Sequence, residues 1–97
     1  MKIYNPTTPS RRSYTSVDYS GLTNLPRHKS LTKRIKSHAG RNNQGRITMR
    51  HQGGGNKIIY RMIDFKQNKI GIKGRIEGIE YDPYRTAFIA LVVYPDG

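Results

Sequence analysis

The sequence predicts a mainly β protein, in which an extended basic N-terminal arm precedes the first three strands of an incomplete antiparallel barrel. Charge is the first reason: residues 1–57 hold 12 of the 18 Lys and Arg residues but only one of the 6 acids, Asp18. Apolar content is the second: residues 58–97 contain 20 apolar side chains, grouped in runs rich in β-forming residues. We therefore divide the chain into an arm, residues 1–57, and a partial barrel, residues 58–97.

The net charge of +12 over 97 residues predicts a polyanionic partner, and nucleic acid before any other. A cationic membrane-surface peptide is the main rival, but it requires a sustained amphipathic helix, and the basic half shows no helical period. The chain has no cysteine, which excludes disulfides and thiolate metal sites. The first residues lack the apolar run of a secretory signal, and the longest apolar stretch, residues 87–94, is too short to span a bilayer.

The opening of the arm favours an extended path, because Pro6, Pro9 and Pro26 interrupt any helix. Residues 30–36 are long enough for a single helical turn, but so short a helix is marginal by itself. We expect the cations of this region to lie along phosphates; they are Arg11, Arg12, Lys33, Arg34 and Lys36.

Only 13 of the first 57 residues are apolar, too few to offset the conformational entropy lost when such a segment is ordered. We therefore expect the arm to be disordered in the free chain and to follow an extended, irregular path when bound. Its tyrosines, Tyr4, Tyr14 and Tyr19, either stack on unpaired bases or pack on nearby protein or RNA, and packing is the favoured alternative.

Residues 40–57 interleave cations, amide side chains and glycines, with almost nothing to bury. Arginines grip phosphate oxygens in a two-point fork, and amides suit base edges, sugar hydroxyls or phosphates. Glycines let backbone N–H groups come close to a ligand. Arg61, from the segment that follows, is added to this set. The predicted nucleic-acid-binding residues are therefore Arg41, Asn42, Asn43, Gln44, Arg46, Arg50, His51, Gly53, Gly54, Gly55, Lys57 and Arg61.

The last 40 residues contain three segments with strand character, separated by turn clusters: residues 58–65, 70–81 and 87–94. In the second segment the apolar positions switch parity beside Gly78, which indicates a bulge or a sharp bend. Residues 82–85 form a turn, with Pro83 in its second position. The third segment is apolar at every position, as expected of a strand covered on both faces.

Three strands curled by a bulge suit a small barrel that has not closed, because a barrel of this type needs about five strands. An open edge beside a strand as apolar as residues 87–94 promotes aggregation, so we expect something to pair with it. Either these residues are the front piece of a longer protein, or a second chain supplies the remaining strands.

Several motifs occur in order along nearly the whole chain. Asn-Pro-Thr-Thr-Pro-Ser-Arg-Arg at 5–12 is followed by Gly-Arg-Asn-Asn-Gln-Gly-Arg-Ile-Thr at 40–48, three glycines at 53–55 and Glu-Tyr-Asp-Pro at 80–83. Together with Tyr-Pro-Asp-Gly at 94–97, they closely resemble the family of the universal second protein of the large ribosomal subunit.

The resemblance implies an OB-fold-like barrel whose first three strands are those described above. It implies large-subunit rRNA and neighbouring ribosomal proteins as partners, and a structural role in assembling and holding that RNA without a cofactor. The family continues with the rest of the barrel, an SH3-like barrel and an extension toward the peptidyl transferase region, so no role there is carried over. Asn56 stands where the family commonly has histidine, which puts one local contact in doubt.

Other functions are less well supported. Gly40 and Gly45 have the spacing of a phosphate loop, but Arg46 and Ile47 follow where a nucleotide site needs Lys and Ser or Thr. No acid or second histidine lies at ligand spacing from the histidines, so we predict neither metal binding nor catalysis at His28, His38 or His51. A free-standing small basic RNA-binding or chaperone protein, closed by self-association, is the alternative function. The lack of a transit peptide favours ribosomes of a bacterial cytoplasm over those of an organelle.

Overall fold

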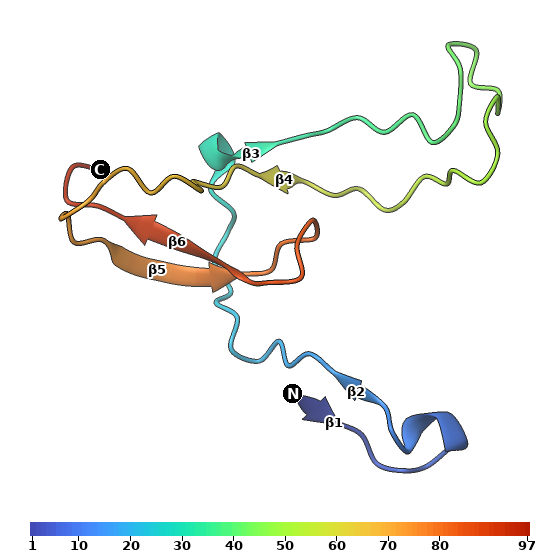
Figure 1. Ribbon diagram of the computed structural model, residues 1–97, viewed down its shortest axis with the longest axis horizontal. Helices are drawn as coiled ribbons and strands as arrows, with labels where there is room; N and C mark the ends of the chain where they lie inside the picture. The colour runs from blue at the N-terminus through green and yellow to red at the C-terminus, as the bar shows by residue number, and fades with distance from the viewer.

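The computed structural model describes residues 1–97 as a mainly β chain without an α-helix. Two 3₁₀ turns, η1 (Pro9–Arg11) and η2 (Lys29–Leu31), accompany six strands. The strands form three antiparallel pairs, β1–β2, β3–β4 and β5–β6 (Figure 1). This confirms the mainly β class. Their bounds are β1 (Lys2–Ile3), β2 (Thr15–Ser16), β3 (Thr32–Lys33), β4 (Tyr60–Arg61), β5 (Arg75–Glu80) and β6 (Ile89–Val93).

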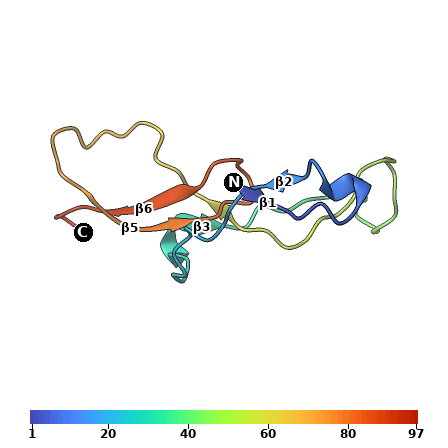
Figure 2. The same cartoon turned by 90° about the horizontal axis from the view of Figure 1, so that it is seen from below.

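The chain is spread out and flat (Figure 2), with extents of 49 × 48 × 23 Å. Its radius of gyration is 19.1 Å, whereas a compact domain of this length has about 13 Å. It forms 26 backbone–backbone hydrogen bonds, where about 65 are usual for a compact domain of this length. No hydrophobic side chain is buried. The arrangement therefore rests on local hydrogen bonds and on partly exposed packing.

The bulge predicted beside Gly78 is confirmed, because the register of β5 on β6 shifts between Ile76 and Gly78. The bulge faces the segment that joins the N-terminal hairpin to η2. Thr23 N–H donates to the Ile79 carbonyl at 2.9 Å, and Ile79 N–H donates to Thr23 Oγ1 at 3.1 Å. A Cβ on Gly78 would lie 2.8 Å from Leu25 Cδ1. Glycine at this position lets the arm pack against the free edge of β5.

Two expectations for the strands need correction. Residues 87–94 were expected to be covered on both faces, yet no residue of β6 is buried. Ile89 and Leu91 are half-buried on one face, beside the β3–β4 pair, while Ala90 and Val92 on the other face are exposed. The first strand segment is shortened to β4, which pairs with β3 rather than with β5. The three predicted strands therefore exist in two separate pairs, and the OB-fold-like closure stays a prediction.

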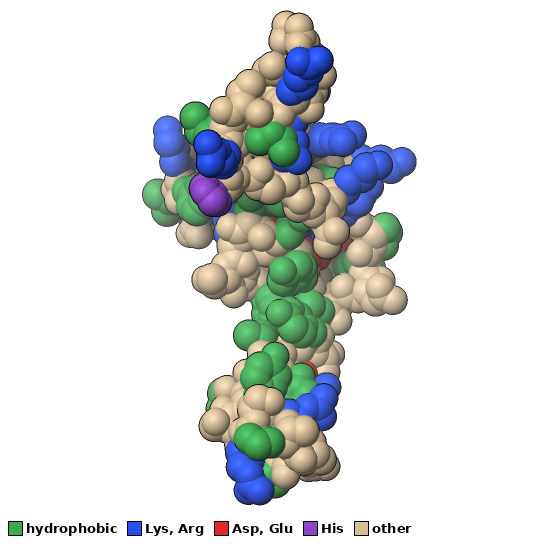
Figure 3. Space-filling view, turned by 90° about the vertical axis from the view of Figure 1, so that its right-hand side faces the viewer, with side chains coloured by type: hydrophobic (Ala, Val, Ile, Leu, Met, Phe, Trp, Pro, Cys, Tyr) green, Lys and Arg blue, Asp and Glu red, His purple; other side chains and the backbone are tan.

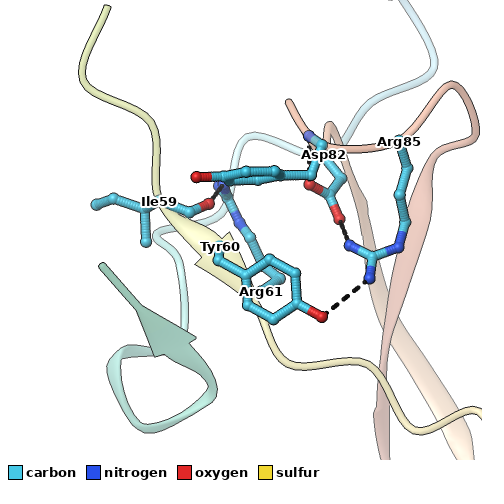
Figure 4. A network of polar contacts seen from close by, with 6 residues as sticks. Ile59, Tyr60, Arg61, Asp82 and Arg85 are labelled. Atoms are coloured by element: carbon cyan, nitrogen blue, oxygen red, sulfur yellow. Dashed lines mark hydrogen bonds and ion pairs between the residues drawn. The ribbon is translucent and has the colours of Figure 1, made fainter. Parts of the chain in front are cut away.

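The predicted turn at residues 82–85 is confirmed and holds a polar network (Figure 4). The Asp82 carboxylate, fully buried, accepts hydrogen bonds from the backbone N–H of Tyr84 and from Arg85 Nη1. Arg85 Nη2 donates to the Tyr60 hydroxyl at 3.3 Å. These two bonds, first that to Tyr60 and then that to Asp82, raise the pKa of the Arg85 guanidinium above its ordinary value. The network ties β4 to the corner that precedes β6.

Candidate nucleic-acid interface

Residues 34–59 leave β3, run outward and return to β4 as two side-by-side stretches (Figure 1). The outgoing stretch, residues 34–38, and the returning stretch, residues 53–58, form no backbone hydrogen bonds with each other. The returning stretch still lies close to the residue that follows the outgoing one, since a Cβ on Gly54 would lie 3.8 Å from Ala39 Cβ. Most of their side chains are exposed. The arm therefore presents unpaired backbone groups and cations to solvent along its length.

Amide exchange tests the order of these stretches in the free chain. We expect the amides of residues 34–37 and 53–57 to exchange at the rate of an unstructured peptide, because none of them donates a backbone hydrogen bond. The β5–β6 hairpin is the internal control and should be slowed by its ladder. Protection along both stretches in the absence of RNA would contradict the expected disorder.

The outer end of the arm, residues 38–52, is the tip. It is folded by its own hydrogen bonds around an isolated bridge between Arg41 and Ile47. Asn42 N–H donates to the Arg46 carbonyl at 3.0 Å. The Gly40 carbonyl accepts hydrogen bonds from the N–H of Thr48 at 2.9 Å and of Met49 at 3.2 Å. In the tip the structure therefore differs from the disorder expected of residues 1–57, because backbone groups of the loop itself pair and give it a specific shape.

Gly40 is required by this loop for two reasons. Its φ of 70° lies in the left-handed region that favours glycine. A Cβ at this position would also overlap the carbonyl oxygen of Met49. Gly40 is one of the few buried residues of the chain. The sequence pattern pointed to Gly40 but not to its close approach to the Met49 carbonyl oxygen.

Replacing Gly40 with alanine should therefore open the tip and weaken RNA binding by about tenfold or more, since the added methyl group and the left-handed φ both oppose the loop. Gly21→Ala is the matched control, because a Cβ on Gly21 meets nothing within 4 Å, its φ needs no glycine, and it lies outside the predicted binding residues. Filter binding of both variants to large-subunit rRNA measures the difference. Equal affinities would show that the loop shape is irrelevant to binding.

Two of the predicted contact residues are engaged inside the tip. Arg41 Nη1 donates to the carbonyls of Ala39 at 2.5 Å and Gln52 at 3.3 Å. Asn42 Oδ1 accepts from the N–H groups of Gln44 and Arg46, each at 3.0 Å. Both side chains hold the loop together through these hydrogen bonds, a role that the sequence pattern did not indicate.

The other predicted side chains of the tip point to solvent and have no hydrogen-bond partner in the chain. They are Asn43, Gln44, Arg46, Arg50 and His51, all exposed. The arm adds further exposed cations, Lys33, Arg34, Lys36 and Lys57. Figure 3 shows Lys and Arg side chains gathered over the upper part of the molecule, and others at its lower end, with hydrophobic side chains exposed between them. The structure thus places the tip residues and the arm cations on the same outward-running loop between β3 and β4, and their exposed side chains form its basic surface.

Arg11 and Arg12 lie apart from that surface, in the hairpin formed by β1 and β2. The Arg11 guanidinium lies 5.5 Å from the centroid of the Tyr4 ring, and Tyr4 lies 5.0 Å from Tyr14. Tyr19 packs on Tyr81 and Phe88, with centroids 5.7 and 5.8 Å away. In this structure the three tyrosines of the arm therefore pack on protein.

Arg61 also lies outside the basic surface of the arm. Its side chain is half-buried, and its Nη1 donates to the Ile59 carbonyl at 2.9 Å, while its Nε is buried without a partner. It lines a small pocket between β4 and β6 together with Leu31 and Glu80. Its position at the base of the arm differs from that of the exposed tip cations.

The electrostatics of the arm are set by cations without nearby acids. Asp18, the acid of the first half, lies outside the tip, and the backbone N–H of Ser20 lowers its pKa below the ordinary value. His, Asp and Glu side chains nowhere gather in a group of three or more that fits a metal ion. No helix reaches the length and apolar character needed to cross a membrane.

Residues 28–97 match the profile of a family described as "Ribosomal Proteins L2, RNA binding N-terminal domain". The matched residues include the whole arm from η2 onward, the tip, and the strand pairs β3–β4 and β5–β6. The N-terminal hairpin with Arg11 and Arg12 lies before the matched region.

Proposed function

The chain belongs to the ribosomal protein L2 family, whose matched domain binds RNA, and on this premise we propose that it is a structural constituent of the large ribosomal subunit. In this role it binds and stabilises large-subunit rRNA during assembly and translation, without catalysing a reaction. The exposed tip and arm, which carry cations unpaired with any acid, are the observation that supports it most directly.

The mechanism we propose combines electrostatic binding of phosphates along the arm with hydrogen bonds from the tip to particular RNA groups. Lys33, Arg34, Lys36 and Lys57 neutralise phosphates along the arm, which supplies affinity without sequence preference. The side chains of the tip contribute hydrogen bonds whose geometry depends on the shape of the RNA. The glycine run at residues 53–55 leaves backbone N–H groups accessible, because none of these residues carries a side chain that shields them.

The site of action we propose is the ribosome in a bacterial cytoplasm, beside neighbouring ribosomal proteins. A second chain, or further residues of a longer polypeptide, would supply strands to the free edge of β6. The exposed apolar side chains of that strand support this proposal, since Val92 and Val93 are 39% and 37% exposed.

The same edge favours the alternative function, a free-standing basic RNA-binding or chaperone protein that closes its sheet by self-association. Two measurements on the purified chain separate the two functions. A ribosomal protein should prefer large-subunit rRNA to random RNA of equal length and should enter reconstituted large subunits. A defined homo-oligomer with no preference between the two RNAs would favour the alternative.

A further inference from the structure

The tip carries two sets of polar groups that differ in what they contact. The inner set is used within the chain: the Arg41 guanidinium donates to the carbonyls of Ala39 and Gln52, and Asn42 Oδ1 accepts from two backbone N–H groups. The outer set has no partner in the chain: it comprises the side-chain amides of Asn43 and Gln44 and the guanidinium of Arg46.

We propose that the tip is a preformed reader of unpaired RNA bases, in which Asn43 and Gln44 contact base edges and Arg41 is a positioning residue. The proposal rests on the RNA-binding function above and specifies what the outer end of the arm recognises. It also separates Arg41 from Arg46, which the sequence presents as equivalent phosphate ligands.

The chemistry of Asn43 and Gln44 supports base contact. A side-chain amide offers donors and an acceptor on one planar group, which matches the paired donor and acceptor pattern of a base edge. The two amides lie within the turn that Asn42 Oδ1 closes through the N–H groups of Gln44 and Arg46. In A-form RNA the major groove is too deep and narrow for side chains, so base edges are offered mainly by loops, bulges and ends.

The position of Arg41 supports a bracing role. Its guanidinium joins carbonyls on both sides of the loop, since Gln52 lies 11 positions further along the chain. The neighbouring backbone is constrained as well, because Ala39 and His51 have positive φ values of 49° and 64°. Such conformations persist only where surrounding contacts hold them. Arg41 therefore lowers the conformational entropy that RNA binding would otherwise have to remove.

Arg46 differs in each of these respects. Its side chain is exposed and makes no hydrogen bond, although its backbone N–H and carbonyl are both used in the loop. A free guanidinium next to amides that read bases is placed to neutralise a phosphate of the same nucleotide segment. The two arginines should therefore respond differently to salt.

The test uses the full chain and three RNA probes: a large-subunit rRNA transcript, a random-sequence transcript of equal length and a perfectly paired duplex. Asn43→Ala and Gln44→Ala should each reduce the preference for the rRNA transcript over the random one by roughly 5- to 150-fold, and leave duplex binding unchanged. An unchanged preference in both variants would overturn base reading.

The role of Arg41 is tested by the slope of log affinity against log salt. Arg46→Ala should reduce the magnitude of the slope by about 0.7–0.9, whereas Arg41→Ala should lower the preference for the rRNA transcript and leave the slope unchanged. Arg41→Lys keeps the charge but ends one bond short of the two carbonyls, so it should not restore the preference. A slope change equal to that of Arg46→Ala, or full rescue by lysine, would overturn the bracing role.

Two controls separate failure of this proposal from failure of the proposed function. If the wild-type chain shows no preference for large-subunit rRNA, the ribosomal function itself is wrong. If the wild type shows the preference, the variants decide the role of the tip. Backbone amide signals of β5–β6 should be unchanged in Arg41→Ala, while those of Gln44 and Arg46 shift, which shows that the change is confined to the tip.

Discussion

The affinity of the chain for large-subunit rRNA should fall roughly 10³- to 10⁵-fold when salt is raised from 50 to 200 mM. The physical reason is counterion release: each phosphate neutralised by Lys or Arg frees a condensed cation, and about eight such contacts give a fall of this size. The exposed cations of the arm and tip supply these contacts, because nothing in the chain pairs with them.

Filter binding or fluorescence anisotropy at several salt concentrations measures this slope. A chain that bound rRNA mainly through apolar stacking would show little dependence on salt. A flat response would therefore exclude phosphate contacts as the main source of affinity, even if the chain bound rRNA tightly.

Replacing Arg41, Arg46 and Arg50 together with alanine should weaken rRNA binding on the order of 10²-fold or more at about 100 mM salt. The variant removes the guanidiniums of Arg46 and Arg50, which have no partner in the chain, and also the link from Arg41 to the carbonyls of Ala39 and Gln52. The loss thus combines fewer phosphate contacts with a less ordered loop.

The matched control replaces Lys69, Lys73 and Arg75, which removes the same formal charge from the second half of the chain. Its effect should be much smaller, because Lys69 already pairs with Asp96 at 2.8 Å and lies over the Tyr94 ring. That hydrogen bond from Lys69 lowers the pKa of the Asp96 carboxyl, so this local charge is neutralised within the protein. Equal losses from the two triple variants would mean that the binding face is misplaced.

Local features of the chain were predictable because they depend on neighbouring residues. The parity switch beside Gly78 indicated the bulge, and the turn at residues 82–85 followed from proline in its second position. The concentration of cations before residue 58 indicated the basic arm, and the family match includes that arm from residue 28 onward.

Features that depend on distant residues were not predictable from the pattern. The pairing of β3 with β4 joins residues on either side of the long arm, and no periodicity records such a pairing. The same holds for Leu25, which lies over Gly78, and for the exposure of β6, which depends on what other layers are present. A run of apolar residues predicts that a strand forms, but it does not predict which other element covers that strand.

A cationic, weakly apolar arm before a β-rich segment is visible in the residues alone, because charge and β propensity are properties of the residues themselves. Which cations have no hydrogen-bond partner within the protein depends on how the loop folds. Arg41 and Arg46 are chemically identical and both are exposed, but only the Arg41 guanidinium donates to carbonyls from both ends of the tip. That difference arises from hydrogen bonds between residues brought together by the loop, and sequence spacing does not encode it.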